Sequence, residues 1–170
     1  LRESREGAKR ADVILVSKCP ENLTKESQKL IRQKLLKFKK EVFFTSISYA
    51  ESVLGASEML TSELKNFEVL LITGIANPAP LLNYLKSLNV KFQHLKYADH
   101  HYFSEKEIEG IKNKFDNMQS SKIILTTEKD YVRLVNKIKN LSYLPIETSF
   151  LNNDNEVFNR LINTHLKENV

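Results

Sequence analysis

The segment Val69-Leu70-Leu71-Ile72-Thr73, followed by Gly74-Ile75-Ala76-Asn77-Pro78, decides the fold class. A continuous run of apolar and β-branched residues is typical of a strand that is buried on both faces, as in a parallel sheet. Glycine and proline then end the strand, and the leucines that follow predict a helix with Pro78 or Pro80 in its first turn. A buried strand that leads directly into a helix is the repeating unit of an α/β domain.

The same alternation of strands and helices continues on both sides of this segment. Further strands are predicted at 13–16, 42–47, 90–97, 123–125 and 143–146. Helices are predicted at about 24–40, 104–115, 132–138 and 157–166. Single helices between strands require right-handed crossovers, so we expect a mostly parallel sheet with helices on both faces. The stretch 49–64 has mixed periodicity and fits a hairpin, a helix or a hinge.

Three of these helices carry N-terminal capping signals. Asn22 or Thr24 can cap the first helix, and Ser104 with a glutamate three residues later forms a capping box. Thr127 with Asp130 gives a similar arrangement at the helix after the 123–125 strand. These signals place loops at the carboxyl ends of strands, which is where ligands bind in α/β sheets.

Composition limits the class of protein. With 170 residues, 41% of them hydrophobic, the chain can bury a core, and one domain is the default. The net charge of +5 permits binding to phosphate, anionic lipid or nucleic acid. Much of the excess positive charge lies at 25–40. It forms either a solvated helix face or a surface that binds anionic headgroups. The single Cys19, expected to be a free buried thiol, indicates a reducing, intracellular location.

The termini and hydropathy give two further expectations. The chain has neither a hydrophobic signal region nor an initiating methionine, and no apolar run reaches the ~18 residues of a membrane span. We therefore expect a soluble or peripheral protein, and a fragment of a longer one.

Asp99-His100-His101 is the sharpest chemical signal, because carboxylate and imidazole groups serve both proton transfer and metal binding. If the backbone is extended there, Asp99 and His101 point to one side and His100 to the other. A metal-dependent phosphoesterase would need acidic motifs upstream such as Asp-x-Asp, which are absent. Alternatively, the three side chains only form hydrogen bonds to the backbone of the loop. His94 and His165 are expected to be surface residues of a strand and a helix.

Thr126-Thr127-Glu128-Lys129-Asp130 is the second polar cluster. Helix capping explains much of it, but Lys129 in the first turn opposes the helix dipole and would be more easily tolerated beside an anion such as phosphate. The glycines nowhere form the G-x-x-x-x-G-K-[ST] loop, so this chain by itself has no Walker-type nucleotide site.

Taken in order, several motifs resemble one family, the tetraacyldisaccharide 4'-kinases of lipid A biosynthesis. They are Leu1-Arg2-Glu3, Arg10-Ala11-Asp12, Ser17-Lys18-Cys19-Pro20, Gly74-Ile75-Ala76-Asn77-Pro78, Asp99-His100-His101-Tyr102-Phe103 and Thr126-Thr127-Glu128-Lys129-Asp130. The resemblance extends through nearly the whole chain, and the last two motifs after a Gly-Ile-Ala turn are its most specific part.

The resemblance implies the C-terminal region of a P-loop NTPase-like kinase, spanning 1–170, with a hairpin linker within about 42–66. Such an enzyme transfers the γ-phosphate of ATP, with magnesium, to the 4'-hydroxyl of a tetraacylated glucosamine disaccharide 1-phosphate. It works in the cytoplasm, at the cytoplasmic face of the inner membrane, and has no nucleic-acid partner. The Walker lysine, the magnesium ligands and a catalytic aspartate belong to the N-terminal half, so this segment alone is expected to be inactive.

The resemblance also implies roles for single residues. His100 matches the histidine that cooperates with the missing aspartate in activating the sugar hydroxyl. Arg2 and Glu3 match a segment close to the nucleotide, although Ser4 stands where the family commonly has proline. By analogy with P-loop proteins, Ser17 and Lys18 are expected to contact the nucleotide.

Asp99, His101 and Lys129 are expected on the substrate or nucleotide side of the same site. Two other classes of function remain open at this point. One is a metal-dependent phosphoesterase that uses Asp99, His100 and His101. The other is a non-catalytic module that binds a nucleotide or a protein.

Overall fold

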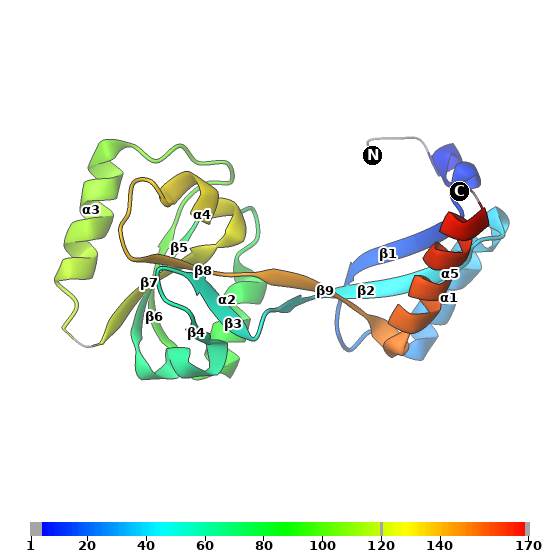
Figure 1. Ribbon diagram of the computed structural model, residues 1–170, viewed down its shortest axis with the longest axis horizontal. Helices are drawn as coiled ribbons and strands as arrows, with labels where there is room; N and C mark the ends of the chain where they lie inside the picture. Colours follow the sequence, from blue (N-terminus) through cyan, green and yellow to red (C-terminus); the bar gives the residue numbers. More distant parts are fainter. Residues whose placement is uncertain (1–4, 120, 169–170) are drawn as a thin grey trace. The chain divides into compact units, whose positions relative to one another are not determined.

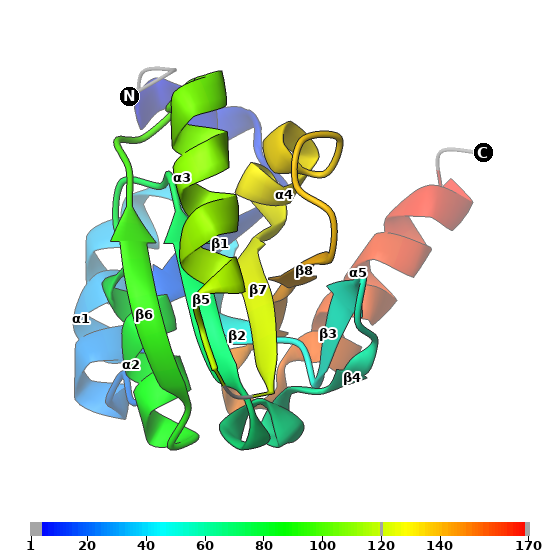
Figure 2. The same ribbon diagram turned by 90° about the vertical axis from the view of Figure 1, so that its left-hand side faces the viewer.

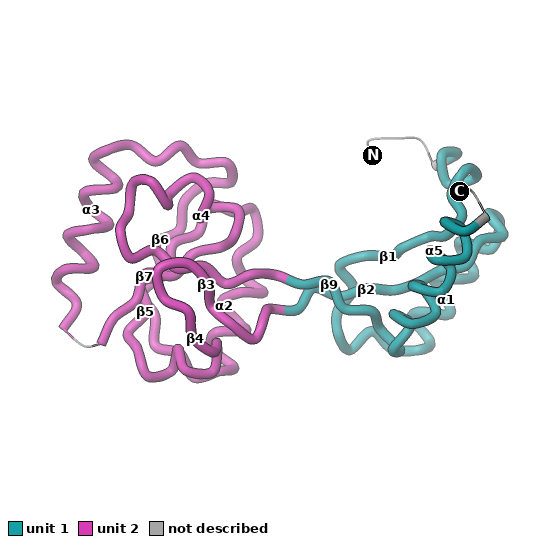
Figure 3. Tube along the Cα trace, viewed as in Figure 1, with its two compact units in different colours: residues 1–48, 147–170 teal, residues 49–146 magenta. Residues whose placement is uncertain are grey.

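The computed structural model describes residues 5–119 and 121–168, and it divides the chain into two compact units (Figure 3). Unit 1 comprises Leu1–Ser48 and Glu147–Val170, and unit 2 comprises Tyr49–Ile146. The chain therefore passes between the units twice. Length and composition, which predicted a single domain, bound the size of a core but not how the chain divides into compact units.

Unit 2 is built on a six-stranded sheet of order β4-β3-β8-β7-β5-β6 (Figures 1 and 2). β5 pairs in parallel with β6 and β7, β7 pairs in parallel with β8, and β3 is antiparallel to both β8 and β4. The strands are β3 (Ser52–Gly55), β4 (Met59–Leu60), β5 (Glu68–Thr73), β6 (Lys91–Lys96), β7 (Lys122–Thr127) and β8 (Leu141–Leu144). The prediction of an α/β fold with a mostly parallel sheet is confirmed.

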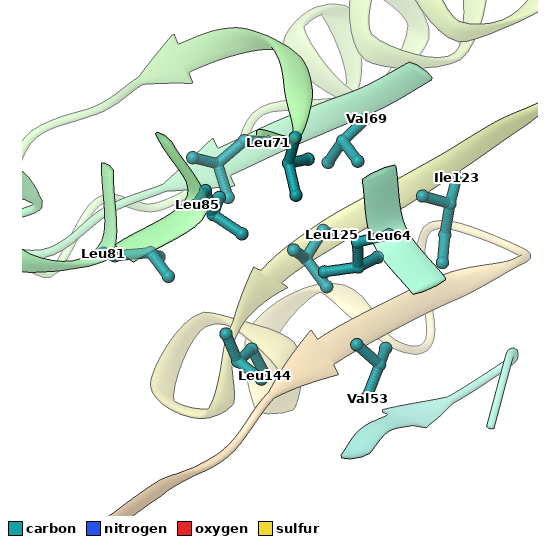
Figure 4. Close-up of a cluster of buried hydrophobic side chains, with 10 residues drawn as sticks. Val53, Leu64, Val69, Leu71, Leu81, Leu85, Ile123, Leu125 and Leu144 are labelled. Atoms are coloured by element: carbon teal, nitrogen blue, oxygen red, sulfur yellow. The ribbon is translucent and has the colours of Figure 1, made fainter. Parts of the chain in front are cut away.

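β5 is an interior strand, between β7 and β6, and faces a core on each side. Val69 and Leu71 belong to one buried cluster, Leu70 and Ile72 to the other, and all four are fully buried. Figure 4 shows the first cluster, where leucines of α2 (Ala79–Ser87) and Leu64 of η3 (Thr61–Asn66) meet the sheet. The second cluster contains residues of α3 (Glu105–Asp116) and α4 (Glu128–Leu134). Helices thus cover both faces, as predicted.

The helix starts in unit 2 follow the local signals in the sequence. Pro78 is the N-cap residue of α2 and Pro80 lies in its first turn. Ser104 forms the predicted capping box at α3, and the Thr127 side chain caps α4. α4 is not shorter than the predicted helix but begins and ends four residues earlier, at Glu128 and Leu134, although Ile138 in the following turn is still buried in the core.

The stretch 49–64, which periodicity did not assign, forms β3, β4 and most of η3 at one edge of unit 2. Val53 of β3 pairs with Met59 of β4 in antiparallel register. A hairpin is therefore present in the stretch, and its role as a linker stays a prediction.

Unit 1 is a three-stranded sheet of order β1-β2-β9, with β1 (Val13–Cys19) parallel to β2 (Glu41–Tyr49). Phe43 of β2 packs edge-on against Phe158 of α5 (Asn155–Glu168), at 5.4 Å between ring centroids. The remaining elements are η1 (Arg5–Arg10), α1 (Lys25–Leu35), η2 (Leu36–Phe38), β9 (Ile146–Phe150) and η4 (Leu151–Asn153). Thr24, rather than Asn22, caps α1.

Two expectations for unit 1 are corrected. β1 is not buried on both faces, because Leu15 is 47% exposed, and the strand lies at the edge of its sheet. Cys19 is only half-buried, and its thiol donates to the Val16 carbonyl at 3.2 Å. Within the described ranges, no helix has the length and apolar character needed to cross a bilayer.

Candidate active site

The carboxyl ends of three adjacent strands in unit 2 bring the two polar clusters of the sequence together. β5 lies between β6 and β7, and Thr73 at its end is opposite Lys96 in the register. The Tyr97 amide continues this pairing and donates to the Thr73 carbonyl at 2.7 Å. Gly74, the 98–101 turn and the start of α4 therefore lie at one edge of the sheet, as expected for an α/β site.

Asp130 ties these segments together from below the surface. Its side chain is fully buried, and Oδ2 accepts from the Gly74 amide at 2.7 Å and from the Thr127 hydroxyl at 2.9 Å. The Thr127 Oγ1 in turn accepts from the Asp130 amide at 3.2 Å, which completes the helix cap. A buried carboxylate needs such partners because ionised groups lose hydration on burial.

The 98–101 segment is a tight turn, not an extended strand. The His101 amide donates to the Ala98 carbonyl at 3.2 Å, and His100 adopts a left-handed φ of 59°. The Asp99 Oδ1 accepts from the His100 amide at 3.1 Å and supports this conformation. The extended alternative, with Asp99 and His101 on one side, is therefore wrong: Asp99 and His100 both reach α4, and His101 reaches α3.

His100 stands between two cations of α4. Its Nδ1 lies 3.2 Å from Arg133 Nη2, and its Nε2 lies 3.4 Å from Lys129 Nζ. The imidazole is largely exposed, at 72% of its side-chain area. An imidazole that is held by α4 and still largely exposed can meet a substrate that arrives from solution.

Lys129 is paired with Asp99 across the two loops. Its Nζ donates to Asp99 Oδ1 at 2.6 Å, and this hydrogen bond is the main cause that lowers the pKa of the Asp99 carboxyl. Lys129 was predicted to tolerate the first turn of α4 by meeting an anion, and the anion present here is Asp99. Binding of substrate or nucleotide by either residue stays a prediction.

His101 is part of a separate group on α3. Its Nε2 lies 2.9 Å from Glu107 Oε1, and its ring is in contact with Tyr97 at 4.9 Å between centroids. The Ser104 hydroxyl and amide, followed by the His101 contact, lower the pKa of Glu107. Desolvation followed by the Glu107 charge raises the pKa of Tyr97. These contacts give His101 a positioning role in the turn.

Of the other predicted site residues, two belong to unit 1 and two are not described. Ser17 and Lys18 are in unit 1, at an exposed irregularity of β1 where Lys18 has a φ of 59°. Arg2 and Glu3 lie outside the described residues. The structure thus brings together Asp99, His100, His101 and Lys129. The contribution of Arg2, Glu3, Ser17 and Lys18 to the site remains a prediction. His165 is exposed on α5, as expected for a surface position, whereas His94 on β6 is half-buried, with its Nε2 2.8 Å from Thr73 Oγ1.

Arg133 is the site residue that the sequence analysis missed. It follows Lys129 by four positions and Asp130 by three, so the three side chains share one side of α4. This spacing was visible in the sequence, but it indicates a site only because the 98–101 turn lies opposite these side chains of α4.

The described residues do not form a metal centre. Among them, no group of three or more His, Cys, Asp or Glu side chains is arranged to hold an ion. A cavity of about 440 Å³ adjoins the site instead, and it opens next to the turn after His101. Its lining residues are Tyr102, Phe103, Ser104, Glu105, Ile108, Glu109, Lys112 and Lys137.

Comparison with known proteins gives relatives with a single description. The profile of a family described as "Tetraacyldisaccharide-1-P 4'-kinase" matches residues 1–167. Tetraacyldisaccharide 4'-kinases of Flavobacterium johnsoniae and Bacteroides thetaiotaomicron are 42% and 35% identical, with 100% and 99% of this chain covered. The alignments cover 49% and 50% of those proteins, so the chain spans about half the length of these curated relatives.

A solved structure supports the fold. The "apo" form of LpxK from Aquifex aeolicus in complex with ATP matches with a TM-score of 0.54 at 20% identity. The match covers 92% of this chain and 44% of that one. Since the family profile extends over almost every residue, the chain belongs to the tetraacyldisaccharide-1-P 4'-kinase family.

Proposed function

We propose that this chain is the C-terminal part of a kinase of lipid A biosynthesis. The enzyme transfers the γ-phosphate of ATP to the 4'-hydroxyl of a tetraacylated glucosamine disaccharide 1-phosphate. The family match over residues 1–167 carries this proposal. The Aquifex relative crystallised with ATP supports the choice of phosphate donor.

His100 is the catalytic residue proposed for this half. It stands at the carboxyl ends of β5, β6 and β7, with an exposed ring fixed by α4. An imidazole in this position can form a hydrogen bond to the reacting hydroxyl or to a carboxylate that receives its proton. Phosphoryl transfer otherwise depends on positioning and charge, which Asp99 and Lys129 would supply around the ring.

ATP and magnesium fit this half poorly. The described residues provide no metal-type cluster, and the sequence has no Walker loop. We therefore assign both mainly to the N-terminal half of the same protein, with Arg2, Glu3, Ser17 and Lys18 as additional nucleotide contacts. The isolated segment 1–170 is accordingly expected to be inactive.

The inner-membrane surface is the proposed partner, because the lipid substrate resides there. Unit 1 offers a basic groove of about 480 Å³ lined by Lys25, Gln28, Lys29, Arg32, Asn152 and Asn153. Arg32 is held in place by its bond to the Val42 carbonyl at 2.6 Å. No carboxylate lines this groove, so it suits an anionic headgroup. Sedimentation with anionic but not with neutral vesicles is the expected result.

The phosphoesterase alternative has no structural support. It needs Asp99, His100 and His101 to converge on a metal, whereas Asp99 binds Lys129 and His101 binds Glu107 on another helix. Binding of manganese that is lost in a His100→Ala variant would favour it again.

The test uses the complete protein that contains this segment, with radiolabelled ATP and the tetraacylated disaccharide 1-phosphate. We expect ATP-dependent phosphorylation, and a His100→Ala variant with turnover reduced by about 10²–10⁴-fold, the usual range for loss of a general acid or base. ATP binding should change little.

The matched control is His165→Ala, which removes an imidazole from α5 in unit 1 and should leave turnover unchanged. Absence of phosphorylation by the wild-type protein would overturn the proposed function. Unchanged turnover of His100→Ala would remove only His100 from the mechanism.

A further inference from the structure

Arg133 links a buried carboxylate to the proposed catalytic imidazole. Its Nη1 lies 3.7 Å from Asp130 Oδ1, and its Nη2 lies 3.2 Å from His100 Nδ1. The Asp130 side chain is fully buried and that of Arg133 is 30% exposed. Asp130 is itself fixed through Oδ2 by the Gly74 amide and the Thr127 hydroxyl, whereas Asp130 Oδ1 and Arg133 Nη1 have no hydrogen-bond partner among the described residues and form an ion pair only.

The two contacts of the ring cannot both be hydrogen bonds to an acceptor nitrogen. Arginine and lysine side chains only donate, and a neutral imidazole has a single acceptor nitrogen. Lys129 already donates to Asp99 at 2.6 Å, and its distance to Nε2 is the longer of the two at 3.4 Å. The Arg133 contact is the shorter of the two at 3.2 Å, and this favours Nδ1 as the acceptor nitrogen.

We propose that Arg133 is a positioning residue that selects the Nε2-protonated tautomer of His100. The proton is then on Nε2, the nitrogen on the side of Asp99 and Lys129, and His100 enters the reaction as a hydrogen-bond donor from that atom. At the backbone, His100 is fixed by its left-handed conformation and by the hydrogen bond from its amide to Asp99 Oδ1. This inference rests on the proposed function of His100 and adds the group that orients it.

The first test is spectroscopic and needs no substrate. In the complete protein with ¹⁵N-labelled histidine, at alkaline pH, the wild-type His100 should show an unprotonated Nδ1 and a protonated Nε2. Arg133→Lys keeps a cation beside Asp130, but its single ammonium cannot bridge carboxylate and ring. We expect a mixture of tautomers in this variant. A protonated Nδ1 in the wild type, or an unchanged tautomer in Arg133→Lys, would overturn the inference.

The second test is kinetic. Arg133→Ala should lower kcat by about 10- to 100-fold, as for loss of one charge-assisted hydrogen bond, with the KM for ATP nearly unchanged. Guanidinium chloride, but not sodium chloride at the same concentration, should restore part of the lost kcat. The matched control is Arg160→Ala on the exposed side of α5, which should behave as wild type.

The two tests separate the inference from the proposed function. If the wild-type protein and its His100→Ala variant behave as proposed while Arg133→Ala retains full kcat, only the inference fails. If Arg133→Ala does not fold, both measurements are made on Arg133→Lys. The expected result is then a lowered kcat and a mixture of His100 tautomers. An inactive wild-type protein refutes the proposed function, while the tautomer measurement still decides on Arg133.

Discussion

The Gly74 amide donates to Asp130 Oδ2 at 2.7 Å, and this bond joins the end of β5 to the start of α4 across 56 residues of sequence. Asp130 also caps its own helix through Thr127, and it lies beside Arg133. One buried carboxylate thus joins the loop after β5 to the start of α4.

Removal of this carboxylate should destabilise unit 2 strongly. In Asp130→Ala, the buried Gly74 amide and the Thr127 hydroxyl lose their acceptor and Arg133 loses its carboxylate. Together these changes should cost roughly 3–5 kcal/mol of the free energy of unfolding. Asp130→Asn keeps one acceptor oxygen and should cost clearly less. Urea unfolding measures both variants, and equal stability of Asp130→Ala and wild type would contradict the assigned role.

Gly74 should tolerate no side chain, because its surroundings are already filled. A Cβ at this position would lie 3.1 Å from Asp130 Oδ1 and 3.3 Å from the Ala98 carbonyl, and neither group is free to move. Gly74→Ala should therefore cost about 1–3 kcal/mol of stability.

Gly110 provides the matched control within the same unit. It lies in the middle of α3, and a Cβ there would meet nothing within 4 Å. Gly110→Ala should stabilise the protein by about 0.5–1 kcal/mol, because alanine favours the helix. Thermal unfolding of the two variants should give shifts of opposite sign. Shifts of the same sign would show that the close approach at Gly74 is not limiting.

The features that were predicted correctly are those encoded locally. The apolar run of β5 and the caps at Thr24, Ser104 and Thr127 each depend on residues within a few positions of one another. The division into two units and the contact of Arg133 with His100 depend on segments far apart in sequence. A loop was predicted after residue 97, but the left-handed backbone of His100 within it was not, because few residues other than glycine adopt that conformation.

Ser104 should support both α3 and the His101 contact. Its hydroxyl accepts from the Glu107 amide, and the Glu107 carboxylate accepts from the Ser104 amide at 2.8 Å and approaches His101 at 2.9 Å. Ser104→Ala should cost about 1 kcal/mol. It should also raise the pKa of Glu107, because the Ser104 hydroxyl is the main cause of its depression.

Amide hydrogen exchange should locate the effect of the Ser104 variant. Faster exchange is expected in the first turn of α3, with α1 unaffected. Thr24→Ala, which removes the cap of α1, should give the reverse pattern. Uniform acceleration in both helices would indicate global destabilisation instead of a local loss of the cap.

Lys129→Ala should change how the Asp99 carboxyl titrates. The hydrogen bond from Lys129 is the main cause that lowers the pKa of Asp99 from the ordinary value of 3.8, so the variant should titrate closer to that value. A carboxyl with a lowered folded-state pKa contributes stability above its unfolded-state pKa, and this contribution is lost as pH falls through the folded-state pKa. The acid-dependent loss of stability below pH ~4 should therefore be weaker in Lys129→Ala. Carbon-detected NMR titration measures Asp99 directly, with Glu107 as the internal control because its lowered pKa arises from Ser104 and His101. If Asp99 titrates identically in both proteins, the pairing with Lys129 does not govern its charge, and the two cations of α4 act on His100 alone.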